Sequence, residues 1–225
     1  EELVLDYLNN IEGTLKAVIN THEHGDHTGG NEGLKNITQC EVWAHQNAKG
    51  QIPDIDRFLS GGENIVLNQE WTLGVLDTPG HTFAHLCLLL SNQGNVEAVF
   101  TGDTLFNAGV GNCHNGGDPE VLYETIHQQF QNLPDQVLVY PGHDYLENNL
   151  KFTMDREPSN VIAEAILKTE KTSQDDLFLV TNMKLEREVN TFLRLDQKEI
   201  ISNLNLTTAT NKQVFLSLRE LRNKW

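Results

Sequence analysis

The chain has 225 residues, of which 38% are hydrophobic and 21% are charged, and its formal net charge is −16. This length suffices for a full hydrophobic core, whereas the acidic balance excludes the basic surface that nucleic-acid binding requires. The sequence contains no run of about 18 apolar residues, so it predicts no membrane span. The three cysteines form no Cys-x-x-Cys pair, so they predict no disulfide framework and favour the cytoplasm.

The first residues predict one helix and one strand. Apolar residues recur at helical spacing within residues 1–10, and residues 15–20 form the short apolar run that is typical of a buried strand. Because the chain opens on Glu1 rather than methionine, we expect that an N-terminal piece precedes it. A targeting segment in that piece would direct the protein to an organelle instead of the cytoplasm.

A cluster of metal-binding residue types follows this strand. His22, His24, Asp26 and His27 fall within six residues. In an extended segment, side chains two residues apart point the same way, so His22 and His24 can bind one ion, while Asp26 and His27, beyond a turn, bind another. A single histidine in a loop is usually only solvated, but four such residues at this spacing predict a metal site.

The chain continues with alternating short strands and helices as far as about residue 152. We expect a helix at 31–34, a surface loop at 51–64, a helix at 118–133 with Asp118 as its N-cap, and strands at 41–44, 71–77, 86–90, 96–101 and 137–140. For His45, a structural or surface role is favoured over metal binding. For His85, orienting a metal ligand is favoured over a purely structural role.

Helical patterns replace strand patterns beyond about residue 152. Helices are predicted at 161–171, 197–204 and 211–223, and the last of these has an apolar stripe that should dock against the rest of the protein. The sequence therefore predicts two domains, residues 1–152 and residues 153–225.

The histidine-rich segment resembles the His-x-His-x-Asp-His motif of the metallo-β-lactamase superfamily, and three later segments match that family in order: Thr78-Pro79-Gly80-His81-Thr82, Phe100-Thr101-Gly102-Asp103-Thr104 and Tyr140-Pro141-Gly142-His143. The resemblance implies that His81 completes the first metal shell, that His143 belongs to the second, and that Asp103 bridges both. It also implies an α+β fold, an αββα sandwich that is followed by a smaller C-terminal helical domain. The first strands of that sandwich are expected to be missing from this chain.

Residues 102–111, 140–145 and 148–158 resemble glyoxalase II, the hydroxyacylglutathione hydrolase family, whose helical domain helps to bind glutathione. The resemblance implies the following substrate-binding candidates: Asn112, His114, Tyr145, Arg219, Arg222 and Lys224. Asn112 and His114 depart from the basic and aromatic residues that are usual there, which leaves the specificity for glutathione open. Alternatively, the C-terminal cations bind no ligand and form a solvated basic helix end that the helix dipole favours. Cys113, in the same loop, is expected to be a small structural residue rather than a reactive thiol.

The resemblance implies a thioester hydrolase with two divalent metal ions, zinc first and iron or manganese as alternatives. A bridging hydroxide, oriented by Asp26 and Asp103, would attack S-lactoylglutathione and give lactate and glutathione. One alternative is a mononuclear-iron persulfide dioxygenase, which keeps the same motif, and another is a non-catalytic metal-binding homologue. The helical tail favours the hydrolase over the first alternative, and the complete ligand set favours it over the second. The acyl group, the thiol carrier and the oligomeric state stay open.

Overall fold

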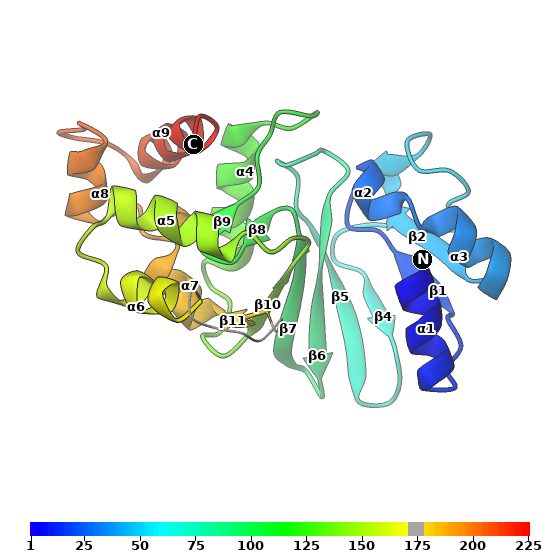
Figure 1. The fold of residues 1–225 in the computed structure, drawn as a ribbon. Helices are drawn as coiled ribbons and strands as arrows, with labels where there is room; N and C mark the ends of the chain where they lie inside the picture. The colour runs from blue at the N-terminus through cyan, green and yellow to red at the C-terminus, as the bar shows by residue number, and fades with distance from the viewer. Residues whose placement is uncertain (171–177) are drawn as a thin grey trace.

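The computed structural model describes residues 1–170 and 178–225, and two β-sheets form its centre (Figure 1). The smaller sheet is parallel and has the order β1-β2-β3, and the larger sheet is mixed and has the order β11-β10-β7-β6-β5-β4. The strands of the two sheets are β1 (Ala17–Ile19), β2 (Glu41–His45), β3 (Arg57–Leu59), β4 (Asn64–Val66), β5 (Trp71–Asp77), β6 (Leu86–Asn92), β7 (Asn95–Gly102), β10 (Leu138–Pro141) and β11 (Thr181–Asn182). Strands β8 (Leu105–Phe106) and β9 (Gly109–Val110) form a separate hairpin.

Helices flank the two sheets on their outer sides, with α1–α3 beside the smaller sheet and α4–α9 beside the larger one (Figure 1). The helices are α1 (Glu2–Asn10), α2 (Gly25–Thr28), α3 (Asn31–Thr38), α4 (Pro119–Thr125), α5 (Leu146–Arg156), α6 (Val161–Glu170), α7 (Met183–Val189), α8 (Lys198–Asn203) and α9 (Asn211–Arg222). Helix α4 continues as the π-helix η2 (Ile126–Phe130), and short 3-10 helices lie at η1 (Gln46–Ala48) and η3 (Thr191–Leu193).

The alternation of side chains along the strands explains the layers. In β6, Leu86 and Leu88 pack between the two sheets, whereas Cys87 joins the core under the C-terminal helices. In β2, Val42 and Ala44 face the outer side, and Trp43 packs toward the other sheet. Strands with two apolar faces of this kind must be covered on both sides, which produces the predicted αββα arrangement.

Several predicted boundaries match the structure closely. Strand β5 coincides with the prediction for residues 71–77, and Asp118 caps α4, because its Oδ1 accepts hydrogen bonds from the main-chain N–H groups of Glu120 (2.7 Å) and Val121 (3.1 Å). Helix α9 begins with a capping box between Thr210 and Gln213 and buries the predicted apolar stripe in part, through Val214, Phe215 and Leu218.

Other predictions differ from the structure. The predicted loop at 51–64 contains β3, whose three residues are too few to show a period. The predicted boundary after residue 152 falls inside α5, so we place the start of the helical region at Leu146 instead. Residue 171 of the predicted helix at 161–171 lies outside the described residues. Within the described ranges, no helix combines the length and the hydrophobicity that crossing a bilayer would take.

Candidate metal centre

The ligand-bearing segments meet at one edge of the sandwich. Strands β5 and β7 both run antiparallel to β6, and β10 runs parallel to β7. The carboxyl ends of β5, β7 and β10 therefore lie at the same edge of the larger sheet. His81, Asp103 and His143 follow their carboxyl ends. The segment after β1 joins them there, because the main-chain N–H of Leu86 donates to the carbonyl of Thr21 (2.8 Å).

His22, His24 and His81 form the first group of converging ligands. Nδ1 of His24 lies 3.1 Å from Nε2 of His22 and 3.1 Å from Nε2 of His81. Main-chain carbonyl oxygens can only accept hydrogen bonds. His81 Nδ1–H therefore donates to the main-chain carbonyl of Asn112 (2.6 Å), and His24 Nε2–H donates to that of Asn115 (3.2 Å). These two hydrogen bonds fix the tautomers and leave the lone pairs directed at the centre of the group.

Burial keeps His22 and His81 of this first group neutral. Burial is the main reason that the pKa of His22 lies far below its ordinary value, and the nearby histidines, His85 first among them, lower it further. Burial also lowers the pKa of His81, although the hydrogen bond to Asn112 acts in the opposite direction. Both imidazoles are therefore uncharged at neutral pH, which is the form that binds a metal ion.

Asp26, His27 and His143 form the second group. Nε2 of His143 lies 3.1 Å from Nε2 of His27 and 3.2 Å from Oδ2 of Asp26. Slight burial acts against ionisation of Asp26, but its own main-chain N–H and three histidines, His27, His143 and His24, outweigh it and lower its pKa. The side chain of Asp26 is 60% exposed, so this group faces the solvent more openly than the first.

Asp103 lies between the two groups. One carboxylate oxygen is 3.3 Å from Nε2 of His27, and the other is 3.6 Å from Nε2 of both His81 and His143. Burial lowers the pKa of His27, but the hydrogen bond and the charge of Asp103 outweigh it, so the net effect is a raised pKa. Gly142 makes room for this arrangement, because a Cβ atom there would lie 2.5 Å from Oδ1 of Asp103.

The donor set fits divalent transition-metal ions. Ligand atoms around a tetrahedral ion bound at about 2.0–2.1 Å lie roughly 3.4 Å from one another, which is close to the 3.1 Å separations within the two groups. Imidazole and carboxylate together suit zinc, iron and manganese. The structure thus brings all seven predicted ligands together.

His85 and His45, which lie outside the two groups, have different surroundings. His85 is fully buried, and its Nε2 accepts a hydrogen bond from the main-chain N–H of Asp103 (3.1 Å). Its Nδ1–H therefore faces the hydroxyls of Thr78 (2.8 Å) and Thr104 (3.1 Å), so His85 holds the main chain of Asp103, a predicted ligand. His45 is buried, its Nδ1 accepts a hydrogen bond from the main-chain N–H of Asn47 (3.1 Å), and its Nε2 lies 3.3 Å from Oδ1 of Asp77.

The predicted substrate-binding residues divide into three kinds. Tyr145 is 45% exposed and stacks on His143 with ring centroids 5.3 Å apart, while partly exposed Arg222 donates to Oδ1 of Asn149 (3.2 Å). Asn112 and His114 are exposed on the loop beside His81. Lys224 is exposed and pairs with Glu220 (2.6 Å), whereas Arg219 is buried and bonds to main-chain carbonyls.

Cys113 is expected to react slowly with alkylating agents. Burial, aided by Asp118, raises the pKa of this thiol to about 11, so little thiolate exists at pH 8. We expect iodoacetamide to modify Cys113 about 10- to 100-fold more slowly than an unhindered cysteine. Mass spectrometry of a time course measures this rate, with the urea-unfolded protein as the control. Modification of Cys113 in the folded protein as fast as in the unfolded one would contradict the expectation.

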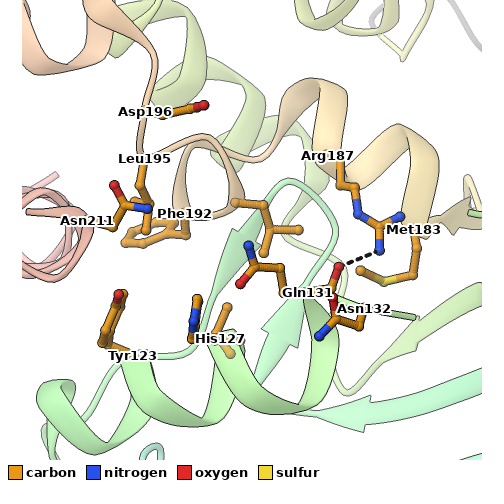
Figure 2. Close-up of a pocket in the computed structure, with 12 residues that line it drawn as sticks. Tyr123, His127, Gln131, Asn132, Met183, Arg187, Phe192, Leu195, Asp196 and Asn211 are labelled. Atoms are coloured by element: carbon orange, nitrogen blue, oxygen red, sulfur yellow. Dashed lines mark hydrogen bonds between the residues drawn. The ribbon is translucent and has the colours of Figure 1, made fainter. Parts of the chain in front are cut away.

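A cavity of about 360 Å³ lies elsewhere, between η2 and the segment that follows α7. Figure 2 shows Tyr123 and His127 on one side of this cavity and Phe192 and Leu195 on the other. Arg187 lies at one end, where it donates to the carbonyl of Gln131 (3.0 Å). The lining of this cavity includes none of the predicted site residues, so the metal cluster is the candidate site.

Comparisons with known proteins agree with this geometry. Residues 3–143 match the model of the metallo-beta-lactamase superfamily, and residues 144–225 match the model of the hydroxyacylglutathione hydrolase C-terminus. The crystal structure of ETHE1 from Myxococcus xanthus has a TM-score of 0.65 and 26% identity, and the match covers 98% of this chain and 82% of that one. Fold and site together define the chain as a metallo-β-lactamase superfamily protein, as the sequence predicts.

Two relatives indicate which family of this superfamily the chain belongs to. A protein named hydroxyacylglutathione hydrolase from Nitrosococcus oceani is 50% identical over 217 residues, which are 94% of this chain and 82% of the relative. Another protein of that name, from a Polaromonas species, is 47% identical with the same coverage. The chain therefore belongs to the hydroxyacylglutathione hydrolase family, and the predicted resemblance is confirmed.

Proposed function

We propose that the protein hydrolyses a hydroxyacylglutathione thioester, S-lactoylglutathione first, to a hydroxy acid and glutathione. The observation that carries the proposal is the convergence of five imidazoles and two carboxylates in a chain whose relatives bear this activity as their name. Two divalent cations bound there would polarise the thioester carbonyl and lower the pKa of the attacking water to near 7.

The residues of the cluster have distinct proposed roles. His22, His24 and His81 would hold one cation, and Asp26, His27 and His143 the other, with Asp103 between them. Zinc fits the imidazole-rich group best, and iron or manganese also fits the mixed group. The carboxylates of Asp26 and Asp103 are proposed to accept hydrogen bonds from the attacking water and so to orient it toward the carbonyl.

The thiol carrier and the acyl group are proposed to lie on opposite sides of the cluster. Tyr145 and Arg222 lie on the side of the helical region, where a guanidinium can bind a carboxylate of glutathione. On the other side, a pocket of about 470 Å³ borders His24 and has Phe83 and Asn47 in its wall. The acyl group would occupy this pocket. The proposed location is the cytoplasm, where the three unpaired thiols would stay reduced.

Replacing Arg222 with glutamine is expected to weaken substrate binding. We expect KM for S-lactoylglutathione to rise about 10-fold with kcat little changed, because a charge-assisted hydrogen bond to a carboxylate is removed from both the ground state and the transition state. Steady-state kinetics measures both constants. Lys151→Gln, which changes an exposed lysine of α5, serves as the matched control and should change neither. An unchanged KM in Arg222→Gln would remove this residue from the proposed site.

The activity itself is tested on the full chain loaded with zinc, iron or manganese. Release of free glutathione from S-lactoylglutathione, which stops when the metal is chelated, is the expected result. Elemental analysis of the same sample should give two ions per chain. One iron per chain together with oxygen uptake on glutathione persulfide would contradict the proposal and favour the dioxygenase. Metal binding with no turnover of any thioester would favour a non-catalytic homologue.

A further inference from the structure

The segment from Asn107 to Asn112, here called the connecting segment, joins the helical region to the metal cluster. It runs through the turn of the β8–β9 hairpin and through β9. At its far end, the carbonyl of Asn112 accepts the hydrogen bond from Nδ1 of His81 (2.6 Å). The position of this segment therefore determines where the acceptor for a metal-ligand histidine lies.

Side chains of the helical region hold the connecting segment at successive main-chain groups. Asn149 of α5 donates to the carbonyl of Asn107 (2.8 Å), and Asn190, just after α7, donates to that of Gly109 (3.0 Å). The main-chain N–H of Ala108 donates to the buried carboxylate of Glu186 (2.9 Å). These bonds are buried, so each would be lost at full desolvation cost if its side chain were truncated.

Arg219 of α9 holds the last part of the connecting segment. Its Nη1 donates to the carbonyls of Val110 (2.9 Å) and Gly111 (2.9 Å), and its Nε donates to Oδ1 of Asn223 (3.0 Å). The residue is 4% exposed, and the guanidinium carbon lies 5.5 Å from the centre of the Phe192 ring. The guanidinium of Arg219 therefore donates its hydrogen bonds within the protein, whereas its neighbour Arg222 is partly exposed to solvent.

Gly111, whose carbonyl Arg219 binds, also contacts the main chain of the cluster. The main-chain N–H of Gly111 donates to the carbonyl of Thr104 (3.2 Å). A Cβ atom at Gly111 would overlap the carbonyl oxygen of Asp103, so the connecting segment passes against the main chain of the bridging ligand. A movement of Val110 and Gly111 would shift the Asn112 carbonyl, and with it the ring of His81.

We propose that Arg219 is a positioning residue, which fixes residues 110–112 where the Asn112 carbonyl orients His81, rather than a residue that binds the substrate. The two arginines of α9 thus have different tasks, with Arg219 acting on the metal shell and Arg222 on the thiol carrier. The kinetic part of this inference rests on the proposed function, but its metal-binding part does not.

The experiment compares Arg219→Gln, Arg219→Lys and Arg222→Gln in the full chain. Competition between the protein and a chelator for Zn²⁺ gives metal affinity, and the visible absorption of the Co²⁺-loaded protein reports the coordination geometry. We expect Arg219→Gln to weaken zinc binding about 10-fold, to alter the Co²⁺ spectrum and to lower kcat while KM changes by less than about twofold. Arg219→Lys should recover part of the loss. Arg222→Gln should leave zinc affinity and the Co²⁺ spectrum unchanged.

Glu220→Gln, on the exposed face of the same helix, is the matched control and should behave as the unaltered protein. If Arg219→Gln does not fold, Asn223→Ala removes the partner of the Arg219 Nε and should weaken zinc binding in the same direction by less. An Arg219 variant that raises KM but leaves zinc affinity and the Co²⁺ spectrum intact would overturn the proposal. Should no variant, nor the parent chain, hydrolyse a thioester, the zinc competition still decides whether Arg219 positions His81.

Discussion

Replacement of Asp103 with alanine is expected to lower kcat for thioester hydrolysis by at least about 10³-fold. Asp103 stands within 3.6 Å of ligand nitrogens from both groups, so its loss separates the two halves of the cluster and removes the negative charge that they share. His27 would also lose the hydrogen bond and the charge that raise its pKa. Steady-state kinetics on metal-loaded protein measures the loss.

Two further variants separate chemistry from folding. Glu97→Gln changes an exposed carboxylate on the same strand, β7, and should retain full activity. Asp103→Asn keeps the shape of the side chain but lowers its charge, so its activity should also be strongly reduced. Thermal unfolding of each metal-free variant reports whether the fold is intact. If Asp103→Ala folds and retains most of the turnover, this cluster is not the catalyst.

The metal ligands could be predicted from the sequence because each segment that carries them follows a short apolar strand, although Asp26 and His27 themselves lie in the short helix α2. Residues 71–77 alternate apolar and polar side chains and become β5, after which the chain turns to present His81. The same relation places Asp103 after β7 and His143 after β10. Strands that run in one direction end at one edge, so residues distant in the chain meet there.

The contacts between the helical region and the cluster could not be predicted from the sequence in this way. Glu186 lies in α7 (sequence Met-Lys-Leu-Glu-Arg-Glu-Val), where a glutamate among lysine and arginine is expected to face solvent. In the structure it is fully buried and accepts from Thr181 (2.7 Å) and Ala108 (2.9 Å), and burial raises its pKa. Thr181 is only five residues away, but Ala108 is 78 residues away, and no local pattern indicates that distant partner.

Arg219 shows the same limit within one helix. The sequence places Arg219 and Arg222 three residues apart, and this spacing suggests a shared task. Which of the two becomes buried depends on how α9 docks, and docking is set by Val214, Phe215 and Leu218 against the core under the helices. The apolar stripe could be predicted, but the partner of each flanking cation could not.

The metal-free protein is expected to lose stability as the pH falls below about 6.5. The pKa values of His22, His81 and His85 are lowered in the folded state, mainly by burial. Below pH 6.5 the unfolded chain, in which histidines have their ordinary pKa, binds more protons than the folded chain, so the free energy of unfolding decreases with falling pH. His27 acts in the opposite direction, because its raised pKa contributes stability that is fully present below pH 6.5.

Three histidines with lowered pKa values oppose the raised pKa values of His27 and Glu186, so we expect a net decrease in the free energy of unfolding, on the order of 1 kcal/mol, between pH 6.5 and pH 5.5. Urea unfolding at each pH, with the metal removed by a chelator, measures this difference. His127→Gln, which changes an exposed histidine outside the cluster, is the control and should show the same loss. A free energy of unfolding that stays level or rises over this pH range would contradict the burial of neutral imidazoles in the cluster.

Metal binding should increase the free energy of unfolding at neutral pH. It should also make the decrease of this free energy on acidification steeper. An ion present at about 1,000 times its Kd stabilises the folded state by about 4 kcal/mol. Protons compete for the same imidazoles, so this gain should disappear by about pH 5. Thermal unfolding with and without Zn²⁺ at pH 7.5, 6.5 and 5.5 tests the coupling. His22→Phe removes one buried ligand and should abolish most of the zinc-dependent gain at pH 7.5, because the remaining imidazoles of that group cannot complete the shell.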